Sequence, residues 1–217
     1  MTSFYIDSAE RQVVEPLLGS GLVAGVTTNP TLLEAAGVRN EAIPDLVSWA
    51  TDAGARAVFV QAWGGSADQL ERRGRDLRAL DDRVVVKLPV TPAGLHATAR
   101  LAADGIPVLV TAVYSATQVL PTMAAGASMI APYLGRMTDA GRDGFAEIAA
   151  MQRVIDASGS TLRVLVASLR TPGDVLRLAE VGVRDFTLGP AVWEQLAADP
   201  LTDAAVAEFE RASQAGS

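Results

Sequence analysis

The sequence predicts an α/β protein with the (β/α)8 barrel, or TIM barrel, fold, and three observations lead to this prediction. Eight short runs rich in β-branched residues alternate with amphipathic stretches along the chain. Most of the runs are apolar without interruption, which is typical of parallel strands covered on both faces. Eight strand-helix units in about 190 residues suggest a barrel of this kind. A doubly wound open sheet is the structural alternative.

The predicted strands follow one another at intervals of roughly 20 to 35 residues, which is too irregular for a solenoid repeat. In chain order they are FYID (4–7), AGVTT (24–28), AVFVQA (57–62), VVVKLP (84–89), VLVTAV (108–113), MIAPYL (129–134), RVLVAS (163–168) and DFTLG (185–189). Since no linker or low-complexity tract interrupts this series, we expect residues 1–217 to form a single barrel domain.

A helix is expected after each strand, and capping residues indicate where several helices begin. Asn29, Thr91 and Thr171 each precede a proline, which suits the first position of a helix. Ser8 and Ser115 are the expected caps after the first and fifth strands. Glycines indicate helix ends, and they are Gly37, Gly54, Gly105, Gly126, Gly159 and Gly182. One further amphipathic helix is expected at about residues 201–213.

Composition excludes several classes of function. The net charge of −7 argues against a nucleic-acid-binding surface, which is normally basic. The chain has no cysteine, so thiol catalysis and cysteine-ligated metals are excluded. With His96 as the one histidine, histidine triads and histidine-rich zinc sites are not expected either. We therefore expect neither a metal nor a nucleic-acid partner.

The N-terminal segment, MTSFYIDSAE, has neither a basic region nor a long apolar stretch, so it is not expected to be a signal peptide. The apolar runs are broken within about ten residues, whereas a membrane span needs roughly 20. These features, with the absence of cysteine, are compatible with a cytoplasmic protein that has no membrane partner.

Lys87 is the candidate nucleophile, because it is the only lysine among 18 basic residues and ends the apolar run VVVKLP. Arginine holds its proton too tightly to act as a nucleophile, whereas a buried lysine can lose its proton near neutral pH. The chemistry this predicts is a Schiff base with a ketone or aldehyde, serving as an electron sink when a C–C bond is made or broken. The alternative is a strand-end lysine whose amine reaches water.

Other polar residues are predicted at the carboxyl ends of the strands, where active sites of barrels are found. Asp7 is a candidate general acid or base, or else a helix cap. Asn29 can serve the site and cap a helix together. Gln61, Thr111 and Tyr133 are candidates for positioning a water for proton transfer, and Tyr133 alternatively packs at the rim of the barrel. The full set is Asp7, Thr27, Asn29, Gln61, Lys87, Thr111, Tyr133, Arg136, Ser168 and Arg170.

An anion site is expected after the sixth and seventh strands. Arg136 follows the sixth strand, and Ser168 and Arg170 follow the seventh in ASLRTPG. Two guanidinium groups, a hydroxyl group and the start of the helix near Pro172 can together hold a phosphate. Each arginine alone is compatible with a surface salt bridge, but the cluster in an acidic protein favours a phosphorylated substrate.

Five segments resemble the small transaldolase-like proteins, the group that contains fructose-6-phosphate aldolase: GVTTNPTLL, VVVKLPVTPAGL, TAVYSATQ, APYLGR and ASLRTPGDV. The likeness extends from residue 4 to the tail, where PLTDAAVAEFE is similar to the terminal helix of that family. The resemblance implies a class I barrel enzyme that uses Lys87 for its Schiff base, with no metal or organic cofactor.

Carried over by position, the resemblance places Asp7, Thr27 and Asn29 beside Lys87 and assigns the substrate phosphate to Arg136, Ser168 and, as a further candidate, Arg170. Transaldolases of the family usually have glutamate at position 61 and phenylalanine at position 133. Gln61, Tyr133 and Thr111 are similar to the aldolase branch, whose tyrosine can deliver a proton that releases the product. The family also implies pentameric rings, often paired into decamers, in which the last helix packs on a neighbour.

The first expectation is therefore a class I aldolase that reversibly cleaves fructose 6-phosphate, or a similar sugar phosphate, into dihydroxyacetone and glyceraldehyde 3-phosphate. A transaldolase of the pentose phosphate pathway, which transfers dihydroxyacetone to a second sugar phosphate, is the alternative. A barrel that binds a sugar phosphate without turning it over is the third. Trp63 and its following glycines, MTDAG (137–141) and Gly189 depart from the family pattern in loops that shape the acceptor pocket.

Overall fold

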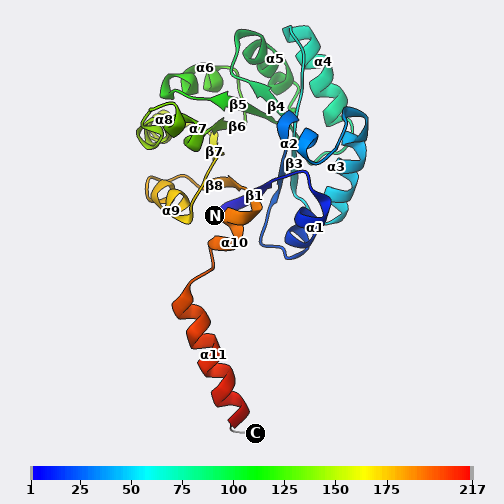
Figure 1. Ribbon diagram of the computed structural model, residues 1–217. Helices are drawn as coiled ribbons and strands as arrows, with labels where there is room; N and C mark the ends of the chain where they lie inside the picture. The colour runs from blue at the N-terminus through cyan, green and yellow to red at the C-terminus, as the bar shows by residue number, and fades with distance from the viewer. Residues whose placement is uncertain (1, 216–217) are drawn as a thin grey trace.

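The computed structural model describes residues 2–215, and within them eight parallel strands form a closed barrel surrounded by helices (Figure 1). The strands are β1 (Ser3–Asp7), β2 (Gly25–Thr27), β3 (Ala57–Gln61), β4 (Val84–Pro89), β5 (Val108–Val113), β6 (Met129–Pro132), β7 (Arg163–Val166) and β8 (Asp185–Leu188). Each strand pairs with the next, and β8 pairs with β1. This closure confirms the predicted barrel and excludes the open sheet.

Helices connect successive strands on the outside of the barrel (Figure 1). The α-helices are α1 (Arg11–Gly19), α2 (Pro30–Ala35), α3 (Ile43–Asp52), α4 (Ala67–Arg78), α5 (Pro92–Ala103), α6 (Val119–Ala124), α7 (Leu134–Asp139), α8 (Gly144–Ser158), α9 (Pro172–Glu180), α10 (Pro190–Gln195) and α11 (Pro200–Ala215). Two 3-10 turns, η1 (Asn40–Ala42) and η2 (Ala116–Gln118), precede α3 and α6.

Most of the predicted caps are confirmed. The side chains of Asn29, Thr91 and Thr171 each accept a hydrogen bond from a backbone N–H in the first turn of the following helix. Ser115 caps the turn η2. The prediction for Ser8 is wrong, because α1 begins later, at Arg11, and the Ser8 hydroxyl instead accepts from the Glu10 N–H at 3.1 Å. All six predicted helix-end glycines have positive φ, which suits glycine best.

Several strands end earlier than predicted, and the difference shapes the mouth of the barrel. The strand β6 stops at Pro132 because the next residues turn into α7, where the Leu134 N–H donates to the Ala167 carbonyl oxygen. The strand β7 stops at Val166, and Ser168 has a left-handed φ of 60° that an extended strand does not allow. Both early ends turn side chains toward the mouth of the barrel.

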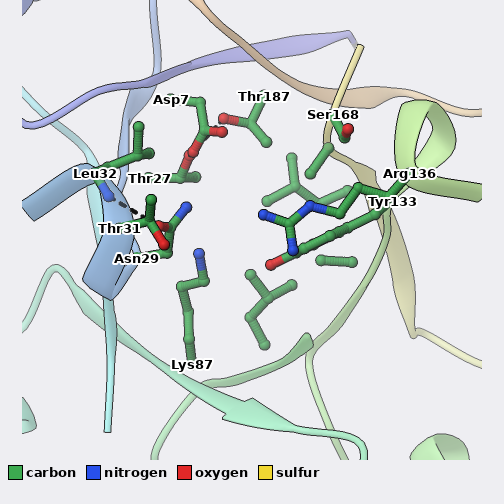
Figure 2. Close-up of a pocket in the computed structure, with 14 residues that line it drawn as sticks. Asp7, Thr27, Asn29, Thr31, Leu32, Lys87, Tyr133, Arg136, Ser168 and Thr187 are labelled. Atoms are coloured by element: carbon green, nitrogen blue, oxygen red, sulfur yellow. Dashed lines mark hydrogen bonds between the residues drawn. The ribbon is translucent and has the colours of Figure 1, made fainter. Parts of the chain in front are cut away.

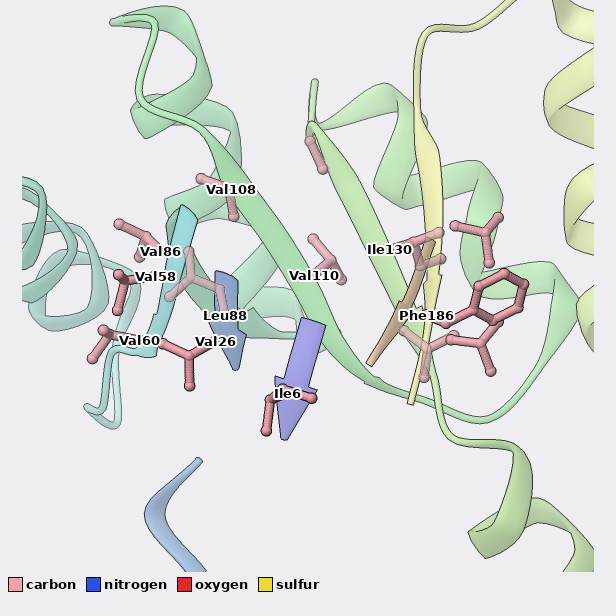
Figure 3. Packing of buried hydrophobic residues seen from close by; sticks show 14 of the residues in the cluster. Ile6, Val26, Val58, Val60, Val86, Leu88, Val108, Val110, Ile130 and Phe186 are labelled. Carbon is pink, nitrogen blue, oxygen red and sulfur yellow. The ribbon is translucent and has the colours of Figure 1, made fainter. Parts of the chain in front are cut away.

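Side chains alternate between two apolar layers along the strands, as expected for a period of two. The outer layer fills the space between barrel and helices, and Figure 3 shows it around Ile6, Val58, Val86, Val110 and Phe186, all fully buried. A second cluster fills the barrel interior, and its buried members are Tyr5, Ala24, Phe59, Leu109, Met129, Ala131 and Leu165.

The same alternation determines which strand-end residues point into the mouth of the barrel. Lys87 on β4 is paired in register with Gln61 on β3 and with Leu109 on β5. Asp7 on β1 is paired in register with Thr27 on β2. At Gly25 the strands approach so closely that a Cβ atom would lie 1.9 Å from the Ala57 carbonyl oxygen. This position therefore requires glycine.

The C-terminal helix α11 extends away from the barrel (Figure 1). It covers the predicted range of about 201–213, beginning at Pro200 and continuing to residue 215. Three large apolar side chains on it, Leu201, Val206 and Phe209, are exposed in this single chain. Along the described part of the chain, no helix combines the length and the apolar character that crossing a bilayer needs.

Candidate active site

Lys87 lies inside the barrel near the carboxyl end of β4, as its position in the strand predicts. Its side chain is 4% exposed, and its Nζ donates to the Thr28 carbonyl oxygen at 2.5 Å. Burial lowers the pKa of the Lys87 amine below its usual value of 10.5, while the negative charge of Asp7 acts in the opposite direction. The amine is therefore buried and directed into the mouth of the barrel (Figure 2).

Thr28 fixes the carbonyl group that holds the amine, and sequence reasoning did not select it. Its backbone N–H and its hydroxyl both donate to the Phe59 carbonyl oxygen, at 3.0 and 2.9 Å. The side chain is fully buried. These two bonds hold residue 28 against β3, so the position of the Lys87 nitrogen depends on the packing of the end of β2 against β3.

Three side chains form a connected polar group beside the lysine. The Thr27 hydroxyl donates to Asp7 Oδ1 at 2.6 Å, and the Oγ1 atoms of Thr27 and Thr187 are 2.5 Å apart. Thr27 and Thr187 are buried on the inner faces of β2 and β8. Sequence reasoning found Asp7 and Thr27 but missed Thr187, although Thr187 has the same inward position in its strand.

Asn29 lines the same cavity and also caps a helix, so both of its expected placements are found together. Its Oδ1 accepts from the Leu32 N–H at 3.0 Å at the start of α2. The amide nitrogen is the group left to face the cavity near Lys87, as Figure 2 shows. Capping thus fixes which end of this amide meets a ligand.

Tyr133 enters the cavity from the side opposite Asp7, and its hydroxyl lies 2.8 Å from Thr111 Oγ1. Burial raises the pKa of the Tyr133 phenol, although the hydrogen bond with Thr111 lowers it in part. Thr111 is followed by Ala112, which has a left-handed φ of 58° within an irregularity of the β5–β6 register. Such a conformation in a non-glycine residue is uncommon and is frequent at functional sites.

Arg136 and Ser168 lie together at the outer side of the cavity (Figure 2). The Arg136 guanidinium carbon is 5.1 Å from the centre of the Tyr133 ring, and Arg136 Nη1 donates to the Tyr114 hydroxyl at 3.5 Å. The helix α7 approaches Ser168 closely at Gly135, where a Cβ would lie 2.6 Å from the Ser168 carbonyl oxygen. A cation and a hydroxyl group thus face the cavity where an anion was predicted.

Three predicted site residues do not line the cavity. Arg170 does not line the cavity but forms an exposed, bidentate ion pair with Asp139, with Nη1 to Oδ1 at 2.8 Å. Gln61 is in register with Lys87 at the end of β3, yet it does not reach the cavity wall either. Thr111 touches the site only through Tyr133.

Seven of the ten predicted residues therefore line one cavity, and Figure 2 shows them pointing from different sides toward a common centre. Apolar and small side chains that no sequence signal identified complete the lining, and they are Leu32, Leu109, Ala131, Leu165 and Ala167, with Thr31 and Thr187 as further polar members. Among residues 2–215, no three acidic or histidine side chains come together as ligands for a metal ion.

Comparison with known proteins gives the family. The sequence model described as "Transaldolase/Fructose-6-phosphate aldolase" matches residues 4–216. This chain belongs to the transaldolase/fructose-6-phosphate aldolase family. The match covers nearly the whole chain, including the strands of the barrel from the second residue of β1 onward, so the family-level resemblance of the sequence motifs is confirmed.

Relatives of this family member share about a third of its residues. It is 37% identical to a probable transaldolase from Rhodospirillum centenum, over 95% of this chain and 88% of that one. It is 35% identical to a probable transaldolase from Geobacter metallireducens, over 95% of both chains. A thiamine phosphate pyrophosphorylase from Pyrococcus furiosus has a TM-score of 0.61 at 15% identity, covering 88% of this chain and 87% of that one, which shows a shared fold.

Proposed function

We propose that this protein is a class I aldolase that reversibly cleaves fructose 6-phosphate, or a similar sugar phosphate, into dihydroxyacetone and glyceraldehyde 3-phosphate. The observation that carries the proposal is the buried Lys87 amine, whose pKa is lowered by burial and which faces a polar cavity. Membership of the transaldolase/fructose-6-phosphate aldolase family supports the same chemistry.

Imine formation is the first step. The neutral Lys87 amine attacks the ketone carbon of the sugar, and loss of water from the adduct gives a protonated imine. The Thr28 carbonyl oxygen accepts one hydrogen of the amine at 2.5 Å, which leaves the nitrogen lone pair for the carbonyl carbon. The amide of Asn29 is placed to hold a hydroxyl group of the bound sugar.

Cleavage of the C–C bond then needs a base at the hydroxyl group two carbons from the imine carbon. Asp7 is the carboxylate in the cavity, and we assign it this role. As it takes the hydroxyl proton, the C3–C4 bond breaks and its electron pair moves to the imine nitrogen. Glyceraldehyde 3-phosphate leaves, and an enamine of dihydroxyacetone remains on Lys87.

Release requires a proton at the enamine carbon C3, and Tyr133 is the proposed donor, directly or through a water positioned with Thr111 and Gln61. The raised pKa of Tyr133 keeps its hydroxyl protonated at neutral pH. Water then hydrolyses the imine and frees dihydroxyacetone. Asp7 then gives the proton it took during cleavage to water, and Tyr133 takes a proton from water to replace the one given to C3, so the enzyme returns to its starting state.

The phosphate group is proposed to bind at the outer side of the cavity to Arg136 and Ser168. A guanidinium and a hydroxyl group together can hold phosphate oxygens in a fixed orientation. Arg170 is a further candidate, although its ion pair with Asp139 must open for it to take part. The substrate then runs from Lys87 toward Arg136.

Transaldolase activity is the second candidate, because the relatives compared with this chain are named probable transaldolases. A transaldolase must keep its enamine until a second aldehyde arrives, whereas an aldolase protonates it. The hydroxyl pair of Tyr133 and Thr111 at 2.8 Å favours protonation. A barrel that binds a sugar phosphate without turnover is the least supported function, because it gives no reason for a buried amine beside a carboxylate.

The test begins with dihydroxyacetone and borohydride, followed by digestion and mass spectrometry. We expect a reduced adduct on Lys87 and none in Lys87→Met, and failure to trap an adduct while the ketone is turned over would contradict the Schiff base. Cleavage of fructose 6-phosphate is then measured with and without erythrose 4-phosphate. Turnover that depends on the acceptor identifies a transaldolase and rejects the aldolase.

We further propose that the chain acts as one domain that assembles into a homo-oligomer, a pentamer or decamer by family resemblance, in the cytoplasm. The exposed Leu201 and Phe209 on the projecting helix α11 support packing on a neighbouring subunit. No metal or organic cofactor, nucleic acid or membrane partner is part of this proposal. Sedimentation velocity tests the assembly, and a monomer at micromolar concentration contradicts it.

A further inference from the structure

Thr187 has no part in the mechanism described so far, yet it lines the cavity beside Asp7 (Figure 2). It comes from the inner face of β8, and its side chain is 3% exposed. Its Oγ1 lies 2.5 Å from Thr27 Oγ1, and Thr27 donates to Asp7 Oδ1 at 2.6 Å. The three side chains therefore form a chain of two short hydrogen bonds.

The direction of these bonds follows from the number of hydrogen atoms available. An ionised carboxylate only accepts, and each threonine hydroxyl has one hydrogen to donate. Thr27 uses its hydrogen toward Asp7, so Thr187 must be the donor in the bond between the two threonines. Thr187 therefore donates to Thr27, and Thr27 donates to Asp7.

This series of hydrogen bonds makes the two carboxylate oxygens of Asp7 unequal. Oδ1 accepts a hydrogen bond whose donor is itself polarised by Thr187, and chains of hydrogen bonds strengthen one another in a buried site. Within residues 2–215, no hydrogen bond reaches Oδ2. The second oxygen is therefore the free acceptor that a substrate hydroxyl can meet.

We propose that Thr187 is a positioning residue for the base: by donating to Thr27 it fixes the Thr27 hydroxyl on Asp7 Oδ1 and so presents Oδ2 to the substrate. The inference rests on the proposed function, since it gives Asp7 the role of base. Thr187 acts through Thr27 and takes no proton in the reaction.

The alternative is that Thr187 only fills space, since β-branched residues pack well in strands. Thr187→Val separates the two explanations because valine keeps the branched shape and removes the hydroxyl. Thr187→Ser restores the donor while removing a methyl group. Thr98→Val is the matched control: Thr98 is a fully buried threonine in α5 whose hydroxyl donates to the Gly94 carbonyl oxygen at 2.8 Å, and it does not line the cavity.

The experiment measures borohydride trapping of dihydroxyacetone, kcat and KM for fructose 6-phosphate, and the melting temperature of all four proteins. In Thr187→Val we expect kcat to fall roughly tenfold, the effect of about one lost hydrogen bond, with KM changed less than about twofold. Thr187→Ser should recover at least about half of the wild-type kcat, because serine donates in the same place. Thr98→Val should keep the wild-type kcat even if it melts earlier.

Each outcome separates this inference from the proposed function. If the wild-type protein forms no trapped adduct and cleaves no substrate, the proposed function fails and the role of Thr187 fails with it. If the wild-type protein is active and folded Thr187→Val has the wild-type kcat, the role of Thr187 alone is overturned. A loss that Thr187→Ser does not recover, or that equals the loss in Thr98→Val, assigns Thr187 to packing and also overturns it.

Discussion

Lys87 Nζ lies 2.5 Å from the carbonyl oxygen of Thr28, a residue whose backbone N–H and hydroxyl both donate to the Phe59 carbonyl oxygen. The contact fixes the amine without a salt bridge to a carboxylate within the described residues. A neutral amine has two hydrogens and one lone pair, so a single acceptor leaves the lone pair available for a carbonyl carbon. Burial of Lys87 thus provides an amine that is held in place while its lone pair stays available for attack.

The rate of adduct trapping should rise with pH and reach half of its maximum below 10.5. Burial lowers the pKa of Lys87, so the neutral amine that attacks the ketone is present at lower pH than in a free lysine. The measurement is the initial rate of adduct formation with dihydroxyacetone and a borohydride that tolerates a range of pH. A midpoint at or above 10.5 would show that the amine behaves as if exposed.

The same burial should make the stability of the wild-type protein, measured against Lys87→Met, increase with pH. Because the folded pKa is lowered, the unfolded state binds more protons between that pKa and 10.5, so stability rises with pH in this window and the contribution is lost below it. One proton limits the slope to about 1.4 kcal/mol per pH unit. Urea unfolding of both proteins across pH gives the difference.

The pH dependence of the difference between the wild-type protein and Lys87→Met separates the effect of the pKa from the effect of the lost hydrogen bond. Loss of the bond to the Thr28 carbonyl changes stability by an amount that does not depend on pH, so it shifts the difference without changing its slope. A difference that is flat, or that falls as the pH rises toward 10.5, contradicts a lowered pKa of Lys87.

The barrel could be predicted from the sequence because each strand is a run of buried apolar residues closed by a turn signal. The same two-residue period also predicts the inner face, on which Asp7, Thr27 and Lys87 lie. Thr187 follows the same rule on β8, but it was not among the strand-end residues selected from the sequence. Periodicity therefore finds more of this site than strand ends alone.

Other features of the site depend on contacts between distant segments, and no local pattern contains them. The pairing of Arg170 with Asp139 joins residues 31 positions apart and removes one predicted phosphate ligand from the cavity. The left-handed conformations of Ala112 and Ser168 are held by the surrounding strands, since neither residue type favours them. Sequence patterns predict the inner face of the strands but not these conformations.

Tyr133→Phe should shift the enzyme from cleavage toward transfer. Removing the hydroxyl removes the proposed donor to the enamine, so cleavage without an acceptor should fall by roughly 10²-fold, in the range of lost general acid catalysis. Transfer to erythrose 4-phosphate needs no such proton and should be retained. The two rates are measured on the same preparation with fructose 6-phosphate.

The matched control for Tyr133 is Tyr5→Phe, which removes a buried phenol hydroxyl from the barrel interior outside the cavity. Tyr5 packs edge-on against Phe59, with ring centres 5.1 Å apart, and does not line the active-site cavity. Its variant should keep both rates. Unchanged cleavage in Tyr133→Phe, or an equal loss in both variants, removes the proposed role of Tyr133.

Gly135→Ala should weaken the use of phosphorylated aldehydes while sparing neutral ones. The added Cβ would lie 2.6 Å from the Ser168 carbonyl oxygen and 2.9 Å from Ser168 Oγ, so α7 and Ser168 must move apart. In the direction of synthesis we expect KM for glyceraldehyde 3-phosphate to rise about tenfold, equivalent to one lost charge-assisted hydrogen bond. KM for unphosphorylated glyceraldehyde should stay near the wild-type value.

Gly173→Ala is the control for the added methyl group, because its Cβ would meet only Thr171 Oγ1 at an ordinary 3.6 Å in the helix α9. It should leave both KM values unchanged. Equal increases of KM for the phosphorylated and the neutral aldehyde in Gly135→Ala would place the effect on the barrel mouth in general and contradict phosphate binding beside Ser168.

Asp139→Asn tests whether Arg170 is a reserve ligand for phosphate. The exposed pair between these residues holds the guanidinium outside the cavity, and asparagine removes the charge that holds it there. Arg170 Nε nevertheless lies near Gly135, 2.8 Å from where its Cβ would be, so the group is close to Ser168. Once released, it can approach a phosphate bound beside Ser168.

We expect Asp139→Asn to lower KM for glyceraldehyde 3-phosphate about two- to fivefold at low salt, which is the size of an exposed ion pair. The gain should shrink as salt is raised, because exposed charges are screened, and it should be absent for neutral glyceraldehyde. Adding Arg170→Ala to the variant should abolish the gain. If KM for the phosphorylated aldehyde stays constant in Asp139→Asn, Arg170 has only a structural pairing with Asp139, and Arg136 and Ser168 bind the phosphate without it.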